Sequence, residues 1–240
     1  MQITHRRVVW VIGASGAIGS QIAARLLEQG DVVVVSSRSS ETLPSPDSGY
    51  DVVPVDITDA QALKDVTSSL VARHGTIDAL VVCTTVPIFG DFLELDDDDW
   101  FNVLDTKLLG SVRAVRAVLP GMIRQGHGRI VLISGRGGTV PPPRHLPGAC
   151  ANAAINLLVQ GLATAHGAHG VRINAVSPGP VASPRLDAMQ RTVSAGVNNA
   201  LGCAASPDDV ADAVLFLLSD HARHITGTSL QVDGGRAPTT

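Results

Sequence analysis

Aromatic residues are scarce in this sequence. Of its 240 residues, 3% are aromatic: four Phe, two Trp and a single Tyr, Tyr50. Aliphatic side chains and Ala must therefore build the core. With 45% hydrophobic and 17% charged residues the chain can bury a large one, which excludes a disordered protein. The length and the uniform composition predict one domain over residues 1–240.

Excess positive charge and long apolar runs are also missing. The formal net charge is −4 and the arginines are scattered, so nothing indicates nucleic-acid binding. No apolar run reaches the ~20 residues that span a bilayer, and the first residues lack a signal-peptide pattern, so we expect no membrane partner and a cytoplasmic location. Three cysteines without a CxxC pair favour free thiols. We predict no metal site, because the four Asp residues at 96–99 stand at a predicted helix start, where carboxylates complement the helix dipole.

Short apolar runs alternate with helical patterns along the whole chain. The predicted strands are residues 8–12, 31–36, 51–55, 79–83, 129–134, 171–177 and 229–232. The predicted helices are residues 17–29, 59–74, 97–125, 149–168 and 207–219. Most of the strands are apolar throughout, which is typical of parallel strands covered on both faces. The pattern predicts a single-domain, doubly wound α/β Rossmann fold: a mostly parallel, seven-stranded sheet with helices on both faces.

A glycine-rich turn follows the first predicted strand. Gly13-Ala-Ser-Gly-Ala-Ile-Gly19 lies between that strand and a helical pattern. Small residues let the backbone turn tightly and let a pyrophosphate approach the N–H groups at the helix N-terminus. The context predicts a dinucleotide site.

The second predicted strand ends in Ser37 and Arg38. Folds that prefer NAD place an acidic residue near this point, about 20 residues beyond the glycines, to bind the ribose 2′-hydroxyl. A hydroxyl and a guanidinium suit a 2′-phosphate instead, because Arg offers forked, charge-assisted donors. We therefore predict NADP(H) as the cofactor; the alternative is that Arg38 is only a solvated surface residue.

Four ordered motifs resemble the short-chain dehydrogenase/reductase family over almost the whole chain. They are the Gly13–Gly19 turn, the Val55-Asp56-Ile57-Thr58 segment, the strand and turn from Arg172 to Val181, and the terminal strand from Gly227 to Gly235. The resemblance implies the Rossmann fold and a nicotinamide cofactor. The cofactor-binding residues predicted from the turn, the second strand and the resemblance together are Gly13, Ser15, Ala17, Ile18, Gly19, Ser37, Arg38, Asp56, Ile57, Cys83, Pro178, Gly179 and Val181.

The family's catalytic residues, a Ser, a Tyr, a Lys four positions later and an Asn on an earlier helix, are all replaced. By local alignment the Ser position falls on Gly135, the Tyr position on Gly148 and the Lys position on Asn152. Lys107 stands where the Asn belongs. Tyr50 lies far away in sequence, and no YxxxK occurs anywhere, so the usual tyrosine acid is missing.

Four residues are candidates to act instead: Lys107, Ser134, His145 and Asn152. Lys107 either restores a positive charge near the cofactor ribose, in exchange with Asn152, or extends to solvent. His145 is either a general acid or a surface-loop histidine. Ser134 replaces the lost Ser only if the strand end bulges. Cys150 is either a nucleophile or a small buried thiol.

These residues leave three functions open. The first is an atypical NADPH-dependent ketoreductase with substrate-assisted or displaced protonation; the loss of the Tyr side chain at Gly148 would enlarge the pocket for a bulky, aromatic or polyketide-like ketone. The second is a non-redox cyclase, dehydratase or isomerase, and the third is a catalytically silent NADP-binding subunit. A substrate loop is expected at about 183–205.

The expected partners are a small-molecule substrate and a second copy of the chain. The resemblance implies a homodimer or homotetramer packed through the helices 97–125 and 149–168. Ala151, Ala154, Leu158 and Leu162 either form that contact or pack on the chain's own sheet.

Overall fold

The computed structural model describes residues 6–184, 186–187, 197 and 199–235. Its seven strands are β1 (Val8–Ile12), β2 (Val32–Ser36), β3 (Asp51–Val52), β4 (Ala79–Val82), β5 (Gly128–Ile133), β6 (Val171–Pro178) and β7 (Ser229–Val232). The long helices are α1 (Ala17–Glu28), α2 (Ala60–His74), α3 (Asp97–Val103), α4 (Gly110–Gln125), α5 (Leu146–His166) and α7 (Pro207–Leu218). A π-helix, η3 (Leu104–Leu109), joins α3 to α4.

The strands form one parallel sheet in the order β3-β2-β1-β4-β5-β6-β7. The order reverses between β1 and β4, and in such sheets ligands bind outside the carboxyl ends of the strands at this switch point. The predicted doubly wound fold is therefore confirmed. The third strand is shorter than predicted, ending at Val52, and the predicted helix 97–125 is divided by η3.

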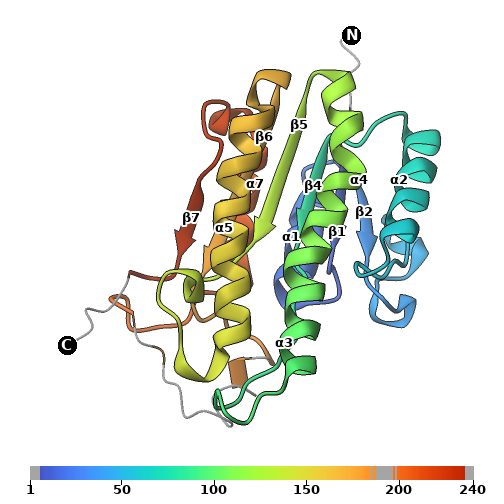
Figure 1. The fold of residues 1–240 in the computed structure, drawn as a ribbon. Helices are drawn as coiled ribbons and strands as arrows, with labels where there is room; N and C mark the ends of the chain where they lie inside the picture. Colours follow the sequence, from blue (N-terminus) through green and yellow to red (C-terminus); the bar gives the residue numbers. More distant parts are fainter. Residues whose placement is uncertain (1–5, 185, 188–196, 198, 236–240) are drawn as a thin grey trace.

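Two layers of helices cover the sheet (Figure 1). Helices α2, α4 and α5 pack on one face, where they meet Val8, Trp10 and Ile12 of β1. Helices α1 and α7 pack on the other face, against Val9 and Val11. Since successive side chains of a strand point to opposite faces, both must be apolar, and this explains the unbroken apolar run in β1.

The helical stretch 143–169, which contains α5, is long and apolar enough to cross a membrane by length and composition alone. In the structure Ile155 and Val159 are fully buried in the core on the α2–α4–α5 side of the sheet. Ala151 is buried, and Leu158 and Leu162 pack against the same core. This stripe of α5 therefore packs on the chain's own core, and a subunit contact through the same helix stays a prediction.

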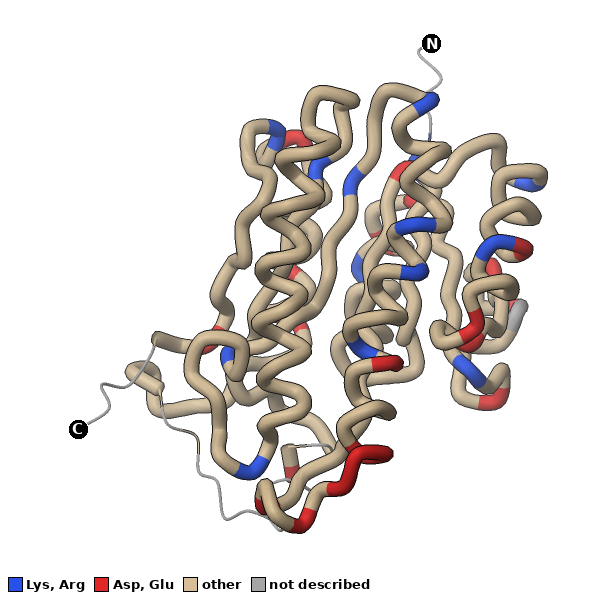
Figure 2. The backbone as a smooth tube through the Cα atoms, viewed as in Figure 1, with Lys and Arg blue, Asp and Glu red and all other residues tan. Residues whose placement is uncertain are grey.

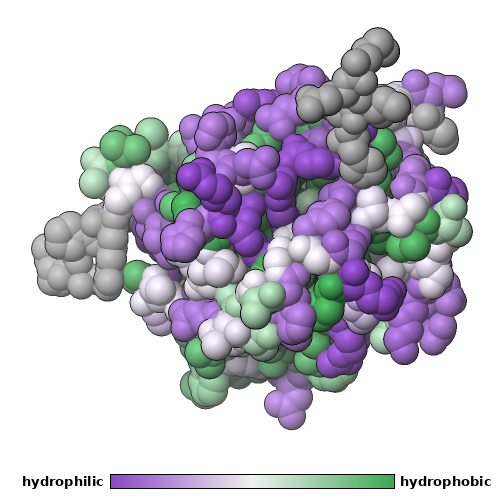
Figure 3. Space-filling model, turned by 90° about the horizontal axis from the view of Figure 1, so that it is seen from above, coloured by the Kyte–Doolittle hydropathy of each residue, from purple (hydrophilic) through white to green (hydrophobic). Residues whose placement is uncertain are grey.

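The acidic residues at 96–99 gather where α3 begins (Figure 2), and Asp96 and Asp99 form a capping box there, as their helix-start position predicts. At the opposite end, above the amino ends of the strands, hydrophilic side chains cover much of the surface and apolar ones form small separate patches (Figure 3).

The described residues contain no cluster of three or more His, Cys, Asp or Glu that could hold a metal ion.

Candidate active site

The turn between β1 and α1 is wedged against the end of β4. Gly13 has φ +88°, a left-handed conformation that favours glycine, and a Cβ there would lie 2.9 Å from the carbonyl carbon of Cys83. A Cβ on Gly19 would lie 2.9 Å from the carbonyl carbon of Gly13 and closer still to its oxygen. The first and last glycines of the motif are therefore required by the packing of strand, turn and helix.

The N-terminus of α1 is open toward this turn. Its N-cap, Gly16, provides no side-chain hydrogen bond to the first helical N–H groups. Such unpartnered donors, together with the helix dipole, favour an anion. The turn and the helix end thus have the shape and the polarity that a pyrophosphate needs.

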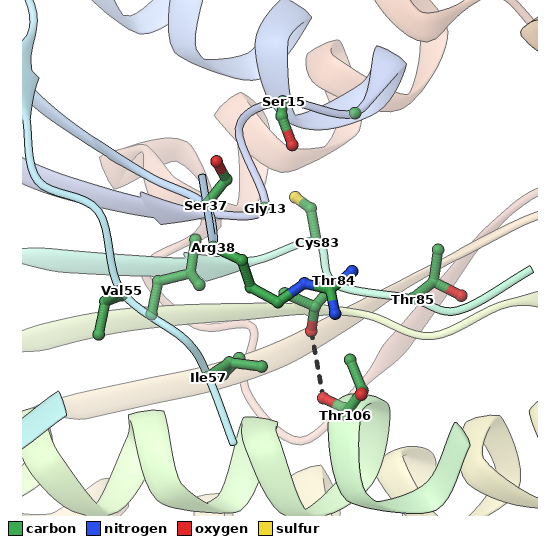
Figure 4. Close-up of a pocket in the computed structure, with 12 residues that line it drawn as sticks. Gly13, Ser15, Ser37, Arg38, Val55, Ile57, Cys83, Thr84, Thr85 and Thr106 are labelled. Atoms are coloured by element: carbon green, nitrogen blue, oxygen red, sulfur yellow. Dashed lines mark hydrogen bonds between the residues drawn. The ribbon is translucent and has the colours of Figure 1, made fainter. Parts of the chain in front are cut away.

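A pocket opens beside this helix end at the switch point of the sheet (Figure 4). It is lined by Ile12, Gly13, Ser15, Gly16, Ser37, Arg38, Val55, Ile57, Cys83, Thr84, Thr85 and Thr106. Six predicted cofactor residues meet here: Gly13, Ser15, Ser37, Arg38, Ile57 and Cys83. The Arg38 side chain extends from the end of β2 over the pocket, which places a guanidinium at its wall (Figure 4).

The other predicted cofactor residues do not line this pocket. Ala17, Ile18 and Gly19 form the first turn of α1. The Asp56 carboxylate accepts hydrogen bonds from the backbone N–H and the hydroxyl of Thr58, at 2.9 and 2.8 Å. Pro178 ends β6, Gly179 packs against Asp233, and Val181 pairs with Ala205. These last three lie at the carboxyl end of β6, two strands away from β4.

Three threonines that line the pocket were missed by sequence reasoning. Thr84 and Thr85 follow β4, and Thr106 lies on η3; the Thr84 hydroxyl donates to the carbonyl of Thr106 at 3.4 Å (Figure 4). A usable signal existed for the first two, because residues that follow a strand at the switch point lie at the ligand edge of the sheet.

Lys107 is a buried cation, only 6% exposed, at the centre of the π-helix η3. Its ammonium donates to the carbonyls of Ile133 and Ser134, at 3.3 and 3.2 Å, where β5 ends. The alternative that Lys107 extends to solvent is therefore wrong. π-Helical turns commonly occur at functional sites, because the extra residue in the turn redirects side chains.

The charge of Lys107 acts close to the pocket. It lowers the pKa of the Cys83 thiol, although burial has the larger effect and raises that pKa to about 12. Cys83 is thus a neutral thiol in the pocket wall, with a cation behind it.

Asn152 and Ser134 meet around Gly135, the position of the family's Ser. A Cβ on Gly135 would lie 2.7 Å from the amide nitrogen of Asn152, so the Asn152 side chain occupies the space beside it. Within the described residues, neither the Ser134 hydroxyl nor the Asn152 side-chain oxygen has a hydrogen-bond partner, although both are buried. The Ser134 N–H still donates to Val176 at 2.8 Å, which continues the ladder, so the strand end does not bulge as that hypothesis required.

His145 lies against Gly148, the position of the family's Tyr. A Cβ on Gly148 would overlap the imidazole, its distance to Cδ2 being 2.9 Å and those to the other ring atoms shorter. The expectation that the missing Tyr leaves an enlarged pocket is therefore wrong at this point, because the His145 ring fills the space next to Gly148.

Tyr50 and Cys150 do not complete a catalytic group with these residues. Tyr50 precedes β3, which is four strands from β5 and hence roughly 19 Å away at strand spacing, and burial raises its pKa. Cys150 is exposed, so the interpretation of a small buried thiol is wrong for it. Part of the predicted substrate loop 183–205, residues 185, 188–196 and 198, lies outside the described residues.

Comparisons with known proteins agree with this architecture. A family model described as enoyl-(acyl carrier protein) reductase matches residues 13–237. NovJ, a short-chain reductase protein of Streptomyces niveus, is 31% identical, covering 98% of this chain and 95% of NovJ. The 3-oxoacyl-[acyl-carrier-protein] reductase FabG of Staphylococcus aureus strain Mu50 is 28% identical over 94% of this chain and 96% of its own. The ligand-free structure of Thermoplasma acidophilum aldohexose dehydrogenase superposes with a TM-score of 0.90 at 28% identity, covering 98% of this chain and 97% of that one. The chain belongs to the short-chain dehydrogenase/reductase family.

Proposed function

We propose that this chain is an atypical NADP(H)-dependent ketoreductase that protonates its substrate without a tyrosine. The observation that carries the proposal is the pocket at the switch point, where the glycine turn, the open end of α1 and the Arg38 guanidinium face one cavity. Arg38 supports NADP(H) over NAD(H), because a guanidinium matches the charge and the oxygens of a 2′-phosphate.

The residues fit the cofactor at both ends of the pocket. The N–H groups of the α1 N-terminus would hold the pyrophosphate, and Ser37 and Arg38 the adenosine ribose with its phosphate. When bound, the cofactor supplies a hydride for a carbonyl carbon. Lys107 would keep a positive charge behind the pocket wall, which favours an anionic ligand in front of it.

The substrate we propose is a bulky ketone of the aromatic or polyketide type. The Phe89 ring, which packs on the imidazole of His145, offers an apolar contact to an aromatic or aliphatic body. This class is compatible with the activity of FabG, a 3-oxoacyl-[acyl-carrier-protein] reductase.

A direct experiment tests the reductase. Purified protein is incubated with NADPH or NADH and a panel of aromatic and 3-oxo ketones, and cofactor oxidation is followed together with transfer of deuterium from labelled NADPH. We expect stoichiometric oxidation of NADPH and a deuterated alcohol. Product without cofactor oxidation would instead indicate a non-redox enzyme.

A second candidate, a catalytically silent NADP-binding subunit, is favoured by one observation. The Lys107 ammonium already donates to the carbonyls of Ile133 and Ser134, which is an arrangement that a purely structural lysine would also show. Tight NADPH binding without turnover on any ketone would support this candidate.

We further propose a homodimer or homotetramer, formed through α3, α4 and α5. Apolar Phe101, Leu109 and Leu157 are exposed on α3, η3 and α5 respectively, Leu157 to 69%. Light scattering after gel filtration tests this, and Leu157→Glu should shift the assembly toward monomer. We propose a cytoplasmic location as well, which the free Cys83, Cys150 and Cys203 support.

A further inference from the structure

The His145 ring occupies the space that a side chain at position 148 would need. Gly148 is buried in the first turn of α5, where a side chain would leave the backbone directly into the imidazole of His145. The overlap involves ring atoms on a short side chain, so neither group can yield by a small shift. A ring that can carry a proton therefore stands at the place from which the family's acidic side chain would project.

The orientation of this ring is set by its neighbours. Nδ1 of His145 lies 3.0 Å from the carbonyl oxygen of Ile88, and because a carbonyl only accepts, Nδ1 carries a hydrogen. The ring packs on Phe89 with a centroid distance of 4.6 Å. The backbone N–H of Gly90 donates to the carbonyl of Arg144 at 3.1 Å, which ties the two loops together. Nε2, which faces Gly148, is therefore the nitrogen that gains and loses a proton.

The loops that hold the imidazole begin at the nucleotide pocket. Ile88 lies three residues beyond Thr85, a pocket-lining residue that follows β4. The loop that carries His145 continues from the end of β5, where Lys107 binds the backbone. Since β4 and β5 are neighbours, the imidazole is held at the carboxyl edge of the sheet next to the switch point.

We propose that His145 is the proton donor of the reductase reaction, in place of the absent tyrosine. The inference rests on the proposed function. As a hydride from NADPH forms the new C–H bond, the carbonyl π electrons move to oxygen, and that oxygen takes the proton from Nε2 of the imidazolium. NADP⁺, an alcohol and neutral His145 result, with the hydrogen on Nδ1 retained. Solvent then returns the proton to Nε2.

The titratable residues next to His145 in the sequence include Arg144 and Cys150. Residues 86–90 contain none, and Arg144, next to His145, pairs with Glu94 at 3.8 Å. Cys150, four residues beyond the first residue of α5, is the first titratable residue along that helix. Because the protonated form is the active one, kcat should fall as the pH is raised, and this limb should be absent from a variant that lacks the imidazole.

The first test is His145→Gln, with His169→Gln on the exposed η6 turn as its control. We expect kcat for ketone reduction to fall about 10²–10⁴-fold in His145→Gln and the falling limb of the pH profile to disappear, with the Kd for NADPH unchanged. His169→Gln should match the wild type. In ¹⁵N-histidine NMR of the cofactor-free protein, one resonance, absent from His145→Gln, should show a titrating Nε2 and a protonated Nδ1 at all pH values.

The second test measures occupancy of the space and needs no activity. Gly148→Ala, His145→Ala and the double variant are compared by thermal unfolding. Gly148→Ala should lower Tm by several degrees when His145 is present and should not lower it in the His145→Ala background, because the added methyl group then enters free space.

The possible results separate this proposal from the proposed function. If the wild type reduces ketones and His145→Gln retains its rate, His145 is not the donor while the reductase stands. Equal Tm losses from Gly148→Ala in both backgrounds would show that the imidazole is elsewhere and would overturn the proposal. A wild type that binds NADPH and reduces no ketone overturns both.

Discussion

The substitutions Gly19→Ala and Gly16→Ala provide a matched pair at the nucleotide turn. Each adds one methyl group to the same turn. At Gly19 the new Cβ would lie 2.9 Å from the carbonyl carbon of Gly13 and 3.0 Å from Cα of Ala14. At Gly16 its nearest neighbour is the Gly13 oxygen at 3.6 Å, an ordinary contact, and φ −82° with ψ 159° suits alanine.

The magnitude follows from what surrounds Gly13. The turn cannot move away from α1, because Gly13 already packs against the backbone of Cys83 and Thr84 at distances that leave no room for a Cβ. Overpacking of this kind costs about 1–3 kcal/mol. For a chain of this length that is a fall in Tm of about 2–12 °C. Gly16→Ala should cost about 1 kcal/mol or less, the difference between Gly and Ala as N-cap residues.

Thermal unfolding and NADPH titration distinguish the two variants. We expect Gly19→Ala to lose both stability and NADPH affinity, since the displaced turn carries the N–H groups. Gly16→Ala should lose at most about 1 kcal/mol of stability and should lose affinity as well, because its methyl group stands where the pyrophosphate would approach. The reasoning is refuted if Gly19→Ala unfolds at the wild-type temperature, or if Gly16→Ala is destabilised as much.

Three further predictions concern single side chains in or directly behind the pocket wall. Arg38→Asp should raise the Kd for NADPH at least tenfold and shift the cofactor preference from NADPH to NADH, while Arg116→Asp on an exposed helix face should change neither. An unchanged cofactor preference in Arg38→Asp would show that Arg38 does not bind the 2′-phosphate. Lys107→Met should weaken NADPH binding, whereas Lys64→Met, at the chain's other and exposed lysine, should not. Equal NADPH affinities of Lys107→Met and the wild type would show that Lys107 has only a structural role. Because burial raises the pKa of Cys83 to about 12, only about one Cys83 thiol in ten thousand is ionised at pH 8. In a Cys150→Ser/Cys203→Ser protein, thiol reagents should therefore modify Cys83 slowly, with a rate that rises about tenfold per pH unit. Labelling as fast as that of the exposed thiols Cys150 and Cys203 would contradict this.

The fold was within reach of sequence reasoning because its signals are local and repeated. The apolar run Val8–Ile12, the glycine turn after it and the helical pattern that follows all form the predicted elements in the structure. Apolar runs and helical patterns then alternate along the rest of the chain. The strand at Asp51–Val52 is shorter than predicted, although the N–H groups of Val53 and Val55 still donate to the carbonyls of Val35 and Ser37 beyond its end. The π-helix at Leu104–Leu109 had no sequence signal, since one extra residue in a turn does not change the hydrophobic period enough to be seen.

The candidate site was only partly predictable. The glycines and Arg38 were found because their roles follow from backbone shape and charge at a fixed place. The burial of Lys107 and the overlap of His145 with Gly148 depend on contacts between segments far apart in the sequence, with β5 in one case and residues 88–90 in the other. Such contacts are properties of packing and are not encoded in the spacing of residue types.

The overlap between position 148 and the His145 ring also restricts how this site can change by mutation. A relative with a side chain at 148 cannot place an imidazole at 145 in this position, so a path toward the present site must first reduce residue 148 to glycine. The reverse holds today: tyrosine at 148 is blocked for as long as His145 keeps its place. The order of substitutions at the two positions is therefore constrained. A return to a tyrosine at position 148 requires that His145 is replaced first.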